Sequence, residues 1–383
     1  MTNMNIHTVK NGETVDKIAE IYGVSADQIR SHNGLPVGEP AVGEELLVLI
    51  PTRTYTVKRG DTPERISLRF GVGGRELMAQ NPFLCDRAMA PGDRLALKYG
   101  EPKMGMGVAN GCFYKGCSIQ RLKRVMPYLT YITVACGTVD GEKITRLFDD
   151  TEVLRTAEEY RKIPLMRIYD SSKRDFSDKD TRKAYAEMLI NAVCGKGYRG
   201  IVLSEREKCE GYGEFLVELR KQMIGCDLIL LTEISETSPS EMNEYADGSI
   251  LSYDKYAMES PSDFKDGERK TYADFACDSE SSKTFISLPT MAKWGRGFCT
   301  IIDALATARH YGCEILRDED TLLCSFCSDR RGTFVYNSLK SIEKMFELIN
   351  EFGYMGISFD IMRTPTAHLM MYNNLFRTAY HGG

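Results

Sequence analysis

Residues 7–33 read HTVKNGETVDKIAEIYGVSADQIRSHN, and residues 55–81 read YTVKRGDTPERISLRFGVGGRELMAQN. The two stretches match at a constant spacing, from the shared Thr-Val-Lys near the start to the asparagine at the end. A stretch of this length that recurs within one chain indicates a repeated structural unit. The sequence therefore predicts two related modules, over residues 5–51 and 53–99.

Each module is predicted to contain a strand, two helices and a second strand. In the first copy, apolar residues recur at helical spacing over residues 15–22, and Gly23 ends this helix. Ser25 is a suitable N-cap for a second helix that runs to His32. Short β-forming segments lie before the first helix and near residues 46–49. The predicted order is βααβ.

This order, the Gly-[Asp/Glu]-Thr turn and the asparagine after the second helix resemble the LysM module. In that family a glycan lies in a groove between the first strand–helix turn and the loop after the second helix. Backbone groups in glycine-containing turns suit an N-acetyl group, and a shallow neutral groove suits an uncharged sugar. The resemblance implies one groove in each module, lined by Gly12, Glu13, Thr14 and Asn33 in the first and by Gly60, Asp61, Thr62, Asn81 and Pro82 in the second.

A purely structural interpretation of the same residues stays open. The glycines would then serve only the tight turns, and the asparagines would only cap helices. For the pair of modules, glycan binding has an added physical argument, because tandem sites gain avidity on a repeating polymer.

From about residue 107 onward, β-forming segments alternate with helical stretches. This alternation is typical of βα units around a parallel sheet. Eight such segments predict a (β/α)8 barrel over residues 107–383, with ligand sites at the C-terminal ends of the strands. Short β-like runs within residues 293–335 predict a small α+β insertion after the seventh strand. The eight segments are GVANGCFY, TYITVACG, PLMRIYD, RGIVLSE, DLILLTE, GSILSYD, TFISLPT and MGISFDI.

Several of these segments resemble family 18 glycoside hydrolases, among them GCFYKG, TYITVACGTVDGE, GKGYRGIVLSE, LSYD and SIEKMFELINEFGYMGISF. The nearest likeness is to the LysM-bearing spore cortex peptidoglycan hydrolases of endospore-forming bacteria, and it spans nearly the whole chain. It implies peptidoglycan or another N-acetylglucosamine polymer, such as chitin, as the partner. It also implies a spore or cell-wall location, with spore or envelope proteins as further partners.

Family 18 enzymes hydrolyse these polymers with help from the substrate's own N-acetyl group, and their fourth strand reads Asp-x-x-Asp-x-Asp-x-Glu. The last glutamate of this motif protonates the leaving oxygen. When the chain is aligned on Gly200, the four motif positions fall on Arg199, Val202, Ser204 and Arg206. A guanidinium gives up no proton in the usable pH range, so Arg206 cannot act as the acid. The resemblance therefore predicts an impaired or inactive barrel.

Besides the inactive barrel, two other hypotheses remain. Glu205 would serve as a displaced acid in an active N-acetylglucosaminidase, although strand alternation places it on the opposite face and a bulge would be needed. Glu207 and Asp360 are further displaced carboxylates. The third hypothesis is that the barrel binds another protein.

Other strand ends keep polar or aromatic groups. Tyr253 and Asp254 match the family's sixth-strand pair, which contacts the N-acetyl group, whereas Asp360 stands where the family has a tryptophan platform. Trp294 is the only tryptophan of the chain and offers either a stacking surface or ordinary packing. A charged cluster at the barrel mouth, either structural ion pairs or a changed ligand site, would consist of Arg206, Glu233, Asp254 and Asp360.

Composition narrows the remaining classes of function. The 383 residues include 43% hydrophobic and 27% charged residues, as in globular proteins, and the net charge of -5 argues against nucleic-acid binding. We expect no membrane segment and no export signal, which fits the spore location or, otherwise, a cytoplasmic one. The 12 cysteines indicate a reducing compartment. Cys324 and Cys327 form half a zinc motif without a second half, so we expect no metal and no cofactor.

Overall fold

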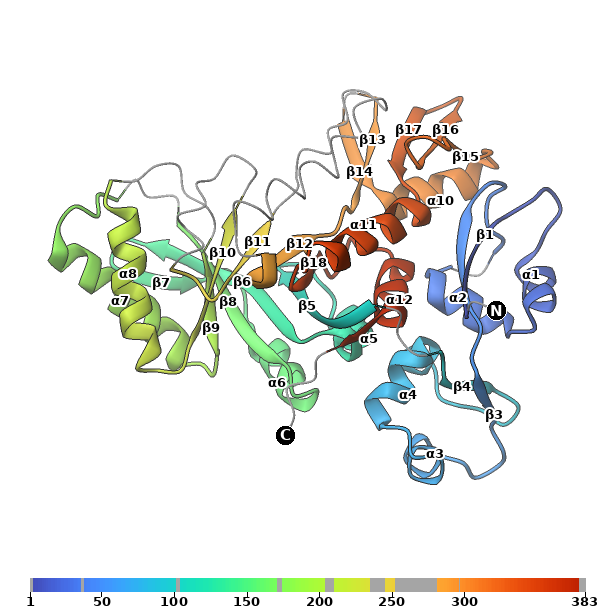
Figure 1. Ribbon diagram of the computed structural model, residues 1–383, viewed down its shortest axis with the longest axis horizontal. Helices are drawn as coiled ribbons and strands as arrows, with labels where there is room; N and C mark the ends of the chain where they lie inside the picture. Colours follow the sequence, from blue (N-terminus) through green and yellow to red (C-terminus); the bar gives the residue numbers. More distant parts are fainter. Residues whose placement is uncertain are drawn as a thin grey trace.

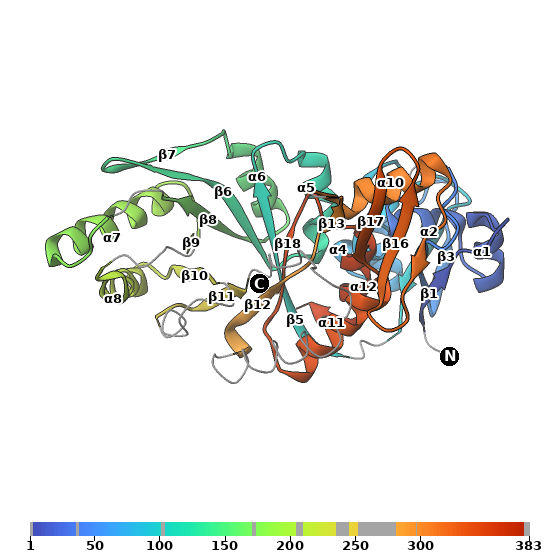
Figure 2. The same ribbon diagram turned by 90° about the horizontal axis from the view of Figure 1, so that it is seen from above.

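A computed structural model describes residues 3–35, 38–100, 104–170, 174–203, 210–234, 245–251, 281–295 and 297–378 (Figure 1). Two small N-terminal modules lie beside a larger barrel, and an insertion rises next to the first module. Figure 2 shows module 1 and the insertion together at one end of the molecule, with α7 and α8 at the other end. Within the described residues, no helix is long and apolar enough to cross a membrane.

The first module, residues 4–49 and called module 1 below, has the predicted βααβ order. Its elements are β1 (Met4–Thr8), α1 (Val15–Tyr22), α2 (Ala26–Asn33) and β2 (Glu45–Leu49), and the two strands pair in antiparallel fashion. The predicted end of the first helix is also present. Gly23 follows α1 in a left-handed conformation, with a φ of 66°. The apolar core of the module lies between the helices and the two-stranded sheet and includes Val15, Ile18, Ile29 and Leu46.

The second module, residues 53–98 and called module 2, repeats this architecture with one addition. Its elements are β3 (Arg53–Thr56), α3 (Pro63–Phe70), α4 (Gly74–Gln80), the 3-10 helix η1 (Pro82–Cys85) and β4 (Arg94–Lys98). The short helix η1 follows the second α-helix and packs against α2 of module 1. Proline begins α3, where its missing N–H costs nothing because that group has no partner within the helix.

The predicted (β/α)8 barrel is confirmed. Each of its eight strands pairs in parallel with the next, and the last pairs with the first, which closes the sheet. Strand β7 (Lys143–Arg146) pairs in antiparallel fashion with the end of β6, and β19 (Phe376–Thr378) pairs with the start of β5. The barrel strands are β5 (Met104–Tyr114), β6 (Tyr131–Asp140), β8 (Ile163–Tyr169), β9 (Gly200–Leu203), β10 (Ile229–Ile234), β11 (Gly248–Leu251), β12 (Thr284–Ser287) and β18 (Gly356–Asp360).

The barrel interior is filled by side chains at one level of successive strands, as is usual for this fold. The rings of Tyr131 and Phe285, on strands that are not neighbours, lie 6.0 Å apart, so both point inward. Val202 belongs to the same inner cluster, whereas Leu203 packs in the layer between the sheet and the outer helices. These outer helices are α5 (Ile119–Val125), η2 (Met126–Tyr128), α6 (Thr151–Glu159), α7 (Lys179–Cys194), α8 (Tyr212–Ile224), η5 (Ser281–Lys283), α11 (Leu339–Glu351) and α12 (Thr366–Leu375).

The predicted α+β insertion follows the seventh barrel strand. It is a five-stranded antiparallel sheet with one helix, and it begins at residue 291 and ends at residue 337, slightly wider than the predicted 293–335. Phe326, Phe334 and Ala304 form part of its separate apolar core. Its elements are β13 (Met291–Trp294), β14 (Gly297–Thr300), α10 (Ile301–Tyr311), β15 (Leu316–Arg317), β16 (Leu323–Ser328) and β17 (Gly332–Asn337).

Candidate functional site

The glycine-containing turn of module 1 is held by the side chain next to the glycine. Gly12 has a φ of 76°, a conformation that favours glycine. The carboxylate of Glu13 accepts hydrogen bonds from the backbone N–H of Lys10 at 2.8 Å and from Nε2 of His7 at 2.8 Å. These two bonds lower the pKa of Glu13, with the backbone bond contributing most. Thr14 then caps α1 by accepting a hydrogen bond from the N–H of Lys17.

Module 2 repeats this turn with different side chains. Gly60 has a φ of 86°. The carboxylate of Asp61 accepts from the N–H of Lys58 and from the hydroxyl of Tyr55, both at 2.7 Å. The same backbone bond is the main cause of a lowered pKa for Asp61. Thr62 caps α3. In both modules, therefore, the carboxylate folds back onto its own turn.

The two asparagines after the second helices join the helix end to the closing strand. Asn81 is fully buried; its Nδ2 donates to the carbonyls of Leu77 at 2.9 Å and Ala96 at 2.7 Å, and its Oδ1 accepts from the N–H of Ala96 at 2.8 Å. Asn33 makes the same three bonds in module 1, to the backbone of Ile29 and Leu47. Both amides are thus bound to the protein itself, which agrees with the structural interpretation left open by the sequence.

Pro82 is buried at the start of η1, next in the chain to Phe83, which belongs to the apolar core of module 2. The exposed part of the second groove wall begins after this helix, at residues 86–88. Pro82 therefore shapes the loop rather than presenting a surface.

At the barrel mouth, Glu233 pairs with a residue that the sequence interpretation did not single out. Glu233 on β10 forms an ion pair with Arg167 on β8, and both side chains are largely buried, with exposed fractions of 16% and 22%. Burial is the largest single influence and would lower the pKa of Arg167, but the charge of Glu233 together with Cys112 and Tyr169 raises it overall. Arg167 also lies over the ring of Tyr169, 5.2 Å from its centroid. Strand alternation in the sequence could have shown that residue 167 faces inward. It could not have shown that Glu233 is its partner.

Asp360 lies at the C-terminal end of β18 and is held by several donors. Its Oδ1 accepts from the hydroxyl of Tyr114 at 3.1 Å and from the N–H groups of Met362 at 2.8 Å and Arg363 at 3.0 Å. The side chain of Arg363 lies 3.5 Å from the other carboxylate oxygen. Asp360 and Glu233 thus have separate sets of partners at the mouth.

The remaining predicted cleft residues of strands four and six lie outside the described residues. These are Ser204, Glu205, Arg206, Glu207, Tyr253 and Asp254. Strand β9 is described as far as Leu203, with Val202 inside the barrel and Leu203 outside it.

Trp294 lies in the insertion sheet at the end of β13. Its ring is stacked on Phe334, with centroids 5.8 Å apart and an angle of 5° between the planes. Its indole N–H donates to the carbonyl of Arg331, whose guanidinium lies 6.0 Å from the ring centroid. About a third of Trp294 is exposed. The ring therefore packs within the insertion and keeps only part of its surface open.

The two cysteines of the half zinc motif point to different environments on β16. Cys324 is buried, and this burial raises the pKa of its thiol to about 12, whereas Cys327 is exposed. Within the described parts of the chain, no group of three or more His, Cys, Asp and Glu side chains is arranged to hold a metal ion.

Comparison with known families identifies the two modules. The LysM domain family matches residues 7–48 and residues 55–98, so the chain carries two LysM domains. No curated protein sequence matches the chain.

Solved structures share the fold of the whole chain. The Bacillus cereus spore cortex-lytic enzyme SleL matches with a TM-score of 0.74 at 17% identity, over 99% of this chain and 100% of that chain. The SleL of Bacillus megaterium matches with a TM-score of 0.72 at 18% identity, over 99% of both chains. A GH18 chitinase from Cycas revoluta, in complex with (GlcNAc)3, matches with a TM-score of 0.57 at 14% identity, over 70% of this chain and 99% of that chain. The barrel therefore has the fold of family 18 enzymes.

Proposed function

We propose that this chain, with two LysM domains ahead of a family 18-like barrel, binds N-acetylglucosamine polymers such as peptidoglycan without hydrolysing them. Two kinds of similarity support an N-acetylglucosamine polymer as the ligand. LysM domains are glycan-binding modules, and a chitinase with the same barrel fold was solved with (GlcNAc)3. The spore cortex-lytic enzymes, which match over the full length, support a location at the spore or cell wall.

The ion pair between Arg167 and Glu233 supports the absence of hydrolysis alongside the altered fourth-strand motif. A general acid must carry a proton and must reach the glycosidic oxygen. A carboxylate that is paired with a guanidinium is held in its ionised form. The carboxylate of Glu233 is therefore engaged with Arg167, although its strand ends at the mouth of the barrel.

Asp360 is engaged in a different way. Three donors converge on its Oδ1, two of them backbone N–H groups of the segment that follows β18. This arrangement fixes the path of the chain after the strand. A new role as an acid would require Asp360 to give up these bonds, so Glu233 and Asp360 are both committed to structural contacts.

The fourth strand supports the same conclusion. With Val202 inside and Leu203 outside, continued alternation would direct Ser204 and Arg206 inward and Glu205 outward. The inward side chains would then include a permanent cation and no carboxylate. An active N-acetylglucosaminidase that uses Glu205 remains the alternative, and it would require an irregularity directly after Leu203.

The polymer specificity is tested by co-sedimentation of the full chain with insoluble peptidoglycan. We expect the protein to be retained, to be released by chitooligosaccharides, and to stay in solution with cellulose, which lacks the N-acetyl group. Equal retention on cellulose, or no retention on peptidoglycan, would remove the proposal.

A further inference from the structure

We propose that module 2 provides the open glycan groove of this protein, whereas module 1 uses the second wall of its groove to hold the barrel insertion. This inference rests on the proposed glycan binding. The first wall of each groove is the glycine-containing turn, residues 10–14 in module 1 and 58–62 in module 2. The second wall is the loop between the second helix and the closing strand.

The second wall of module 1 is part of the interface with the insertion. Ala41 is buried in the apolar core of the insertion, and the carbonyl of Val42 accepts a hydrogen bond from the N–H of Ile315 at 2.9 Å. Gly43 follows, with a φ of 80°, and a Cβ at this position would lie 1.8 Å from the carbonyl oxygen of Ile315. Only glycine fits there, so the loop and the insertion approach each other as closely as their backbones permit.

Two ion pairs complete this interface. The carboxylate of Glu44 accepts from Arg309 at two points, Nε at 2.9 Å and Nη2 at 2.5 Å, while its exposed fraction is only 3%. Glu45 is equally buried and pairs with Arg317. A two-point bond between an arginine and a carboxylate fixes orientation as well as distance. The loop is therefore held rigidly against the insertion.

In module 1 the two groove walls are also joined to each other. Glu39, in the second wall, accepts a hydrogen bond at 2.7 Å from the N–H of Val15, which directly follows the first wall. Arg30 holds the other oxygen of Glu39 at 3.2 Å. The N–H of Val15 is one of the donors at the start of α1 that have no partner within the helix. In this module a side chain of the protein already occupies that donor.

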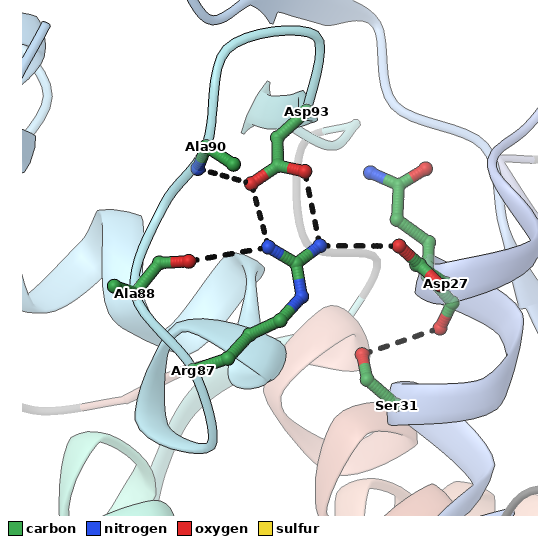
Figure 3. A network of polar contacts seen from close by, with 7 residues as sticks. Asp27, Ser31, Arg87, Ala88, Ala90 and Asp93 are labelled. Carbon is green, nitrogen blue, oxygen red and sulfur yellow. Dashed lines mark hydrogen bonds and ion pairs between the residues drawn. The ribbon is translucent and has the colours of Figure 1, made fainter.

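Module 2 uses the corresponding residues differently. Asp93 is the counterpart of Glu44, since each accepts from a backbone N–H three residues earlier, Ala90 at 2.8 Å and Ala41 at 3.0 Å. The partner of Asp93 is Arg87 from its own loop, at 2.8 and 3.0 Å, and not a residue of the barrel (Figure 3).

Arg87 extends from this loop to module 1 as well. As Figure 3 shows, it also reaches Asp27 on α2, at 3.1 Å. One arginine thus closes the turn of module 2 and joins the two modules. The neighbouring residues 86, 88 and 90–92 are exposed, and of these Asp86 forms an ion pair at 3.2 Å with Arg124 on α5 of the barrel.

The walls of the second groove lack a side-chain link like that of Glu39. Pro63 is at the position that Val15 has in module 1. Because proline has no N–H, a hydrogen bond like the one from Val15 to Glu39 cannot form here. Residues 58–63 and 86–91 are all described, and no hydrogen bond runs between these two segments. Gly60 is exposed, with open space where a side chain would begin. The groove of module 2 is therefore free to accept a glycan.

A matched pair of substitutions tests this division. Gly12 and Gly60 occupy the same turn position, share a left-handed φ, and have nothing within 4 Å of the position that a Cβ would take, so Gly12→Gln and Gly60→Gln carry equal strain and equal bulk. The assay is retention of each full-length variant on insoluble peptidoglycan. We expect Gly60→Gln to weaken retention roughly ten-fold, equivalent to about 1.4 kcal/mol. Retention of Gly12→Gln should stay within about two-fold of the unaltered chain, a difference of about 0.4 kcal/mol.

Hydrogen–deuterium exchange of the unaltered chain with hexameric N-acetylglucosamine gives an independent measurement that depends on no variant. Protection should appear in peptides that cover residues 58–63 and 86–92. An equal or larger loss with Gly12→Gln, no loss with either variant, or protection confined to residues 10–15 and 38–44 would overturn the division between the modules. If the unaltered chain is not retained at all, the proposed glycan binding falls with it.

Discussion

Arg167 and Glu233 form an ion pair inside the barrel mouth from β8 and β10, the two strands that flank β9. In family 18 enzymes the fourth strand, here β9, carries the catalytic carboxylates. The ion pair therefore spans β9, whose residue Val202 lies opposite Arg167 in the sheet register. Its two residues thus lie on the two sides of the strand on which the proposed loss of activity depends.

The ion pair should act as a structural contact. Glu233→Gln leaves the guanidinium of Arg167 largely buried without its counter-charge, and removal of one partner of a buried pair costs about 3 kcal/mol. We expect this decrease in the free energy of unfolding in urea, with unchanged retention on peptidoglycan. The double variant Arg167→Met with Glu233→Gln should recover part of the loss. Unchanged stability of Glu233→Gln together with altered glycan binding would assign the pair to a ligand site instead.

The asparagine of module 2 should likewise matter for folding. Asn81→Ala removes three hydrogen bonds and leaves the carbonyls of Leu77 and Ala96 short of a donor, which should cost about 2–3 kcal/mol. We expect a lower thermal midpoint for the variant, and Asn33→Ala in module 1 serves as the matched comparison. Normal stability combined with lost retention on peptidoglycan would show instead that Asn81 contacts the glycan.

Two buried histidines should make stability depend on pH. Burial lowers the pKa of His32 to about 4 and that of His368 to about 3, whereas both take up a proton near pH 6.5 in the unfolded chain. Between these values the unfolded state binds more protons than the folded state. The contribution is therefore complete above pH 6.5 and is lost as the pH falls, with a slope of up to about 2.7 kcal/mol per pH unit.

This slope is measured by urea unfolding at several pH values from 7 to 4.5. The double variant His32→Gln with His368→Gln should show a flatter profile than the unaltered chain. Identical profiles for the two proteins would mean that these side chains do not titrate as their burial requires.

Periodic features of the chain were predictable from the sequence. The repeat of residues 7–33 at 55–81 and the eight β-forming segments are local patterns, and the structure has the corresponding elements in the predicted order. The fourth strand also alternates in the structure, because Val202 and Leu203 belong to two different apolar clusters. The spacing of apolar residues indicates whether a segment is a helix or a strand and which of its faces is buried. This information is enough to predict a fold class.

Pairings between distant residues were not predictable. Glu44 and Arg309 lie far apart in the chain, and each resembles an ordinary surface charge in its own segment. Only the docking of module 1 on the insertion brings them together. Arg167 was missed for the same reason, because its partner is two strands away in the sheet. The Asn33 and Asn81 amides bond to backbone groups of the closing strand of each module. This strand lies later in the sequence than the helix that carries the asparagine, so the helix pattern alone does not predict the orientation.

Binding without cleavage is tested most directly by counting new reducing ends with mass spectrometry after the full chain is incubated with chitooligosaccharides and spore cortex fragments. At protein concentrations at which peptidoglycan retains the chain, we expect no more reducing ends than in a sample without protein. New reducing ends that disappear in the variant Glu205→Gln would contradict this expectation and would identify an active hydrolase.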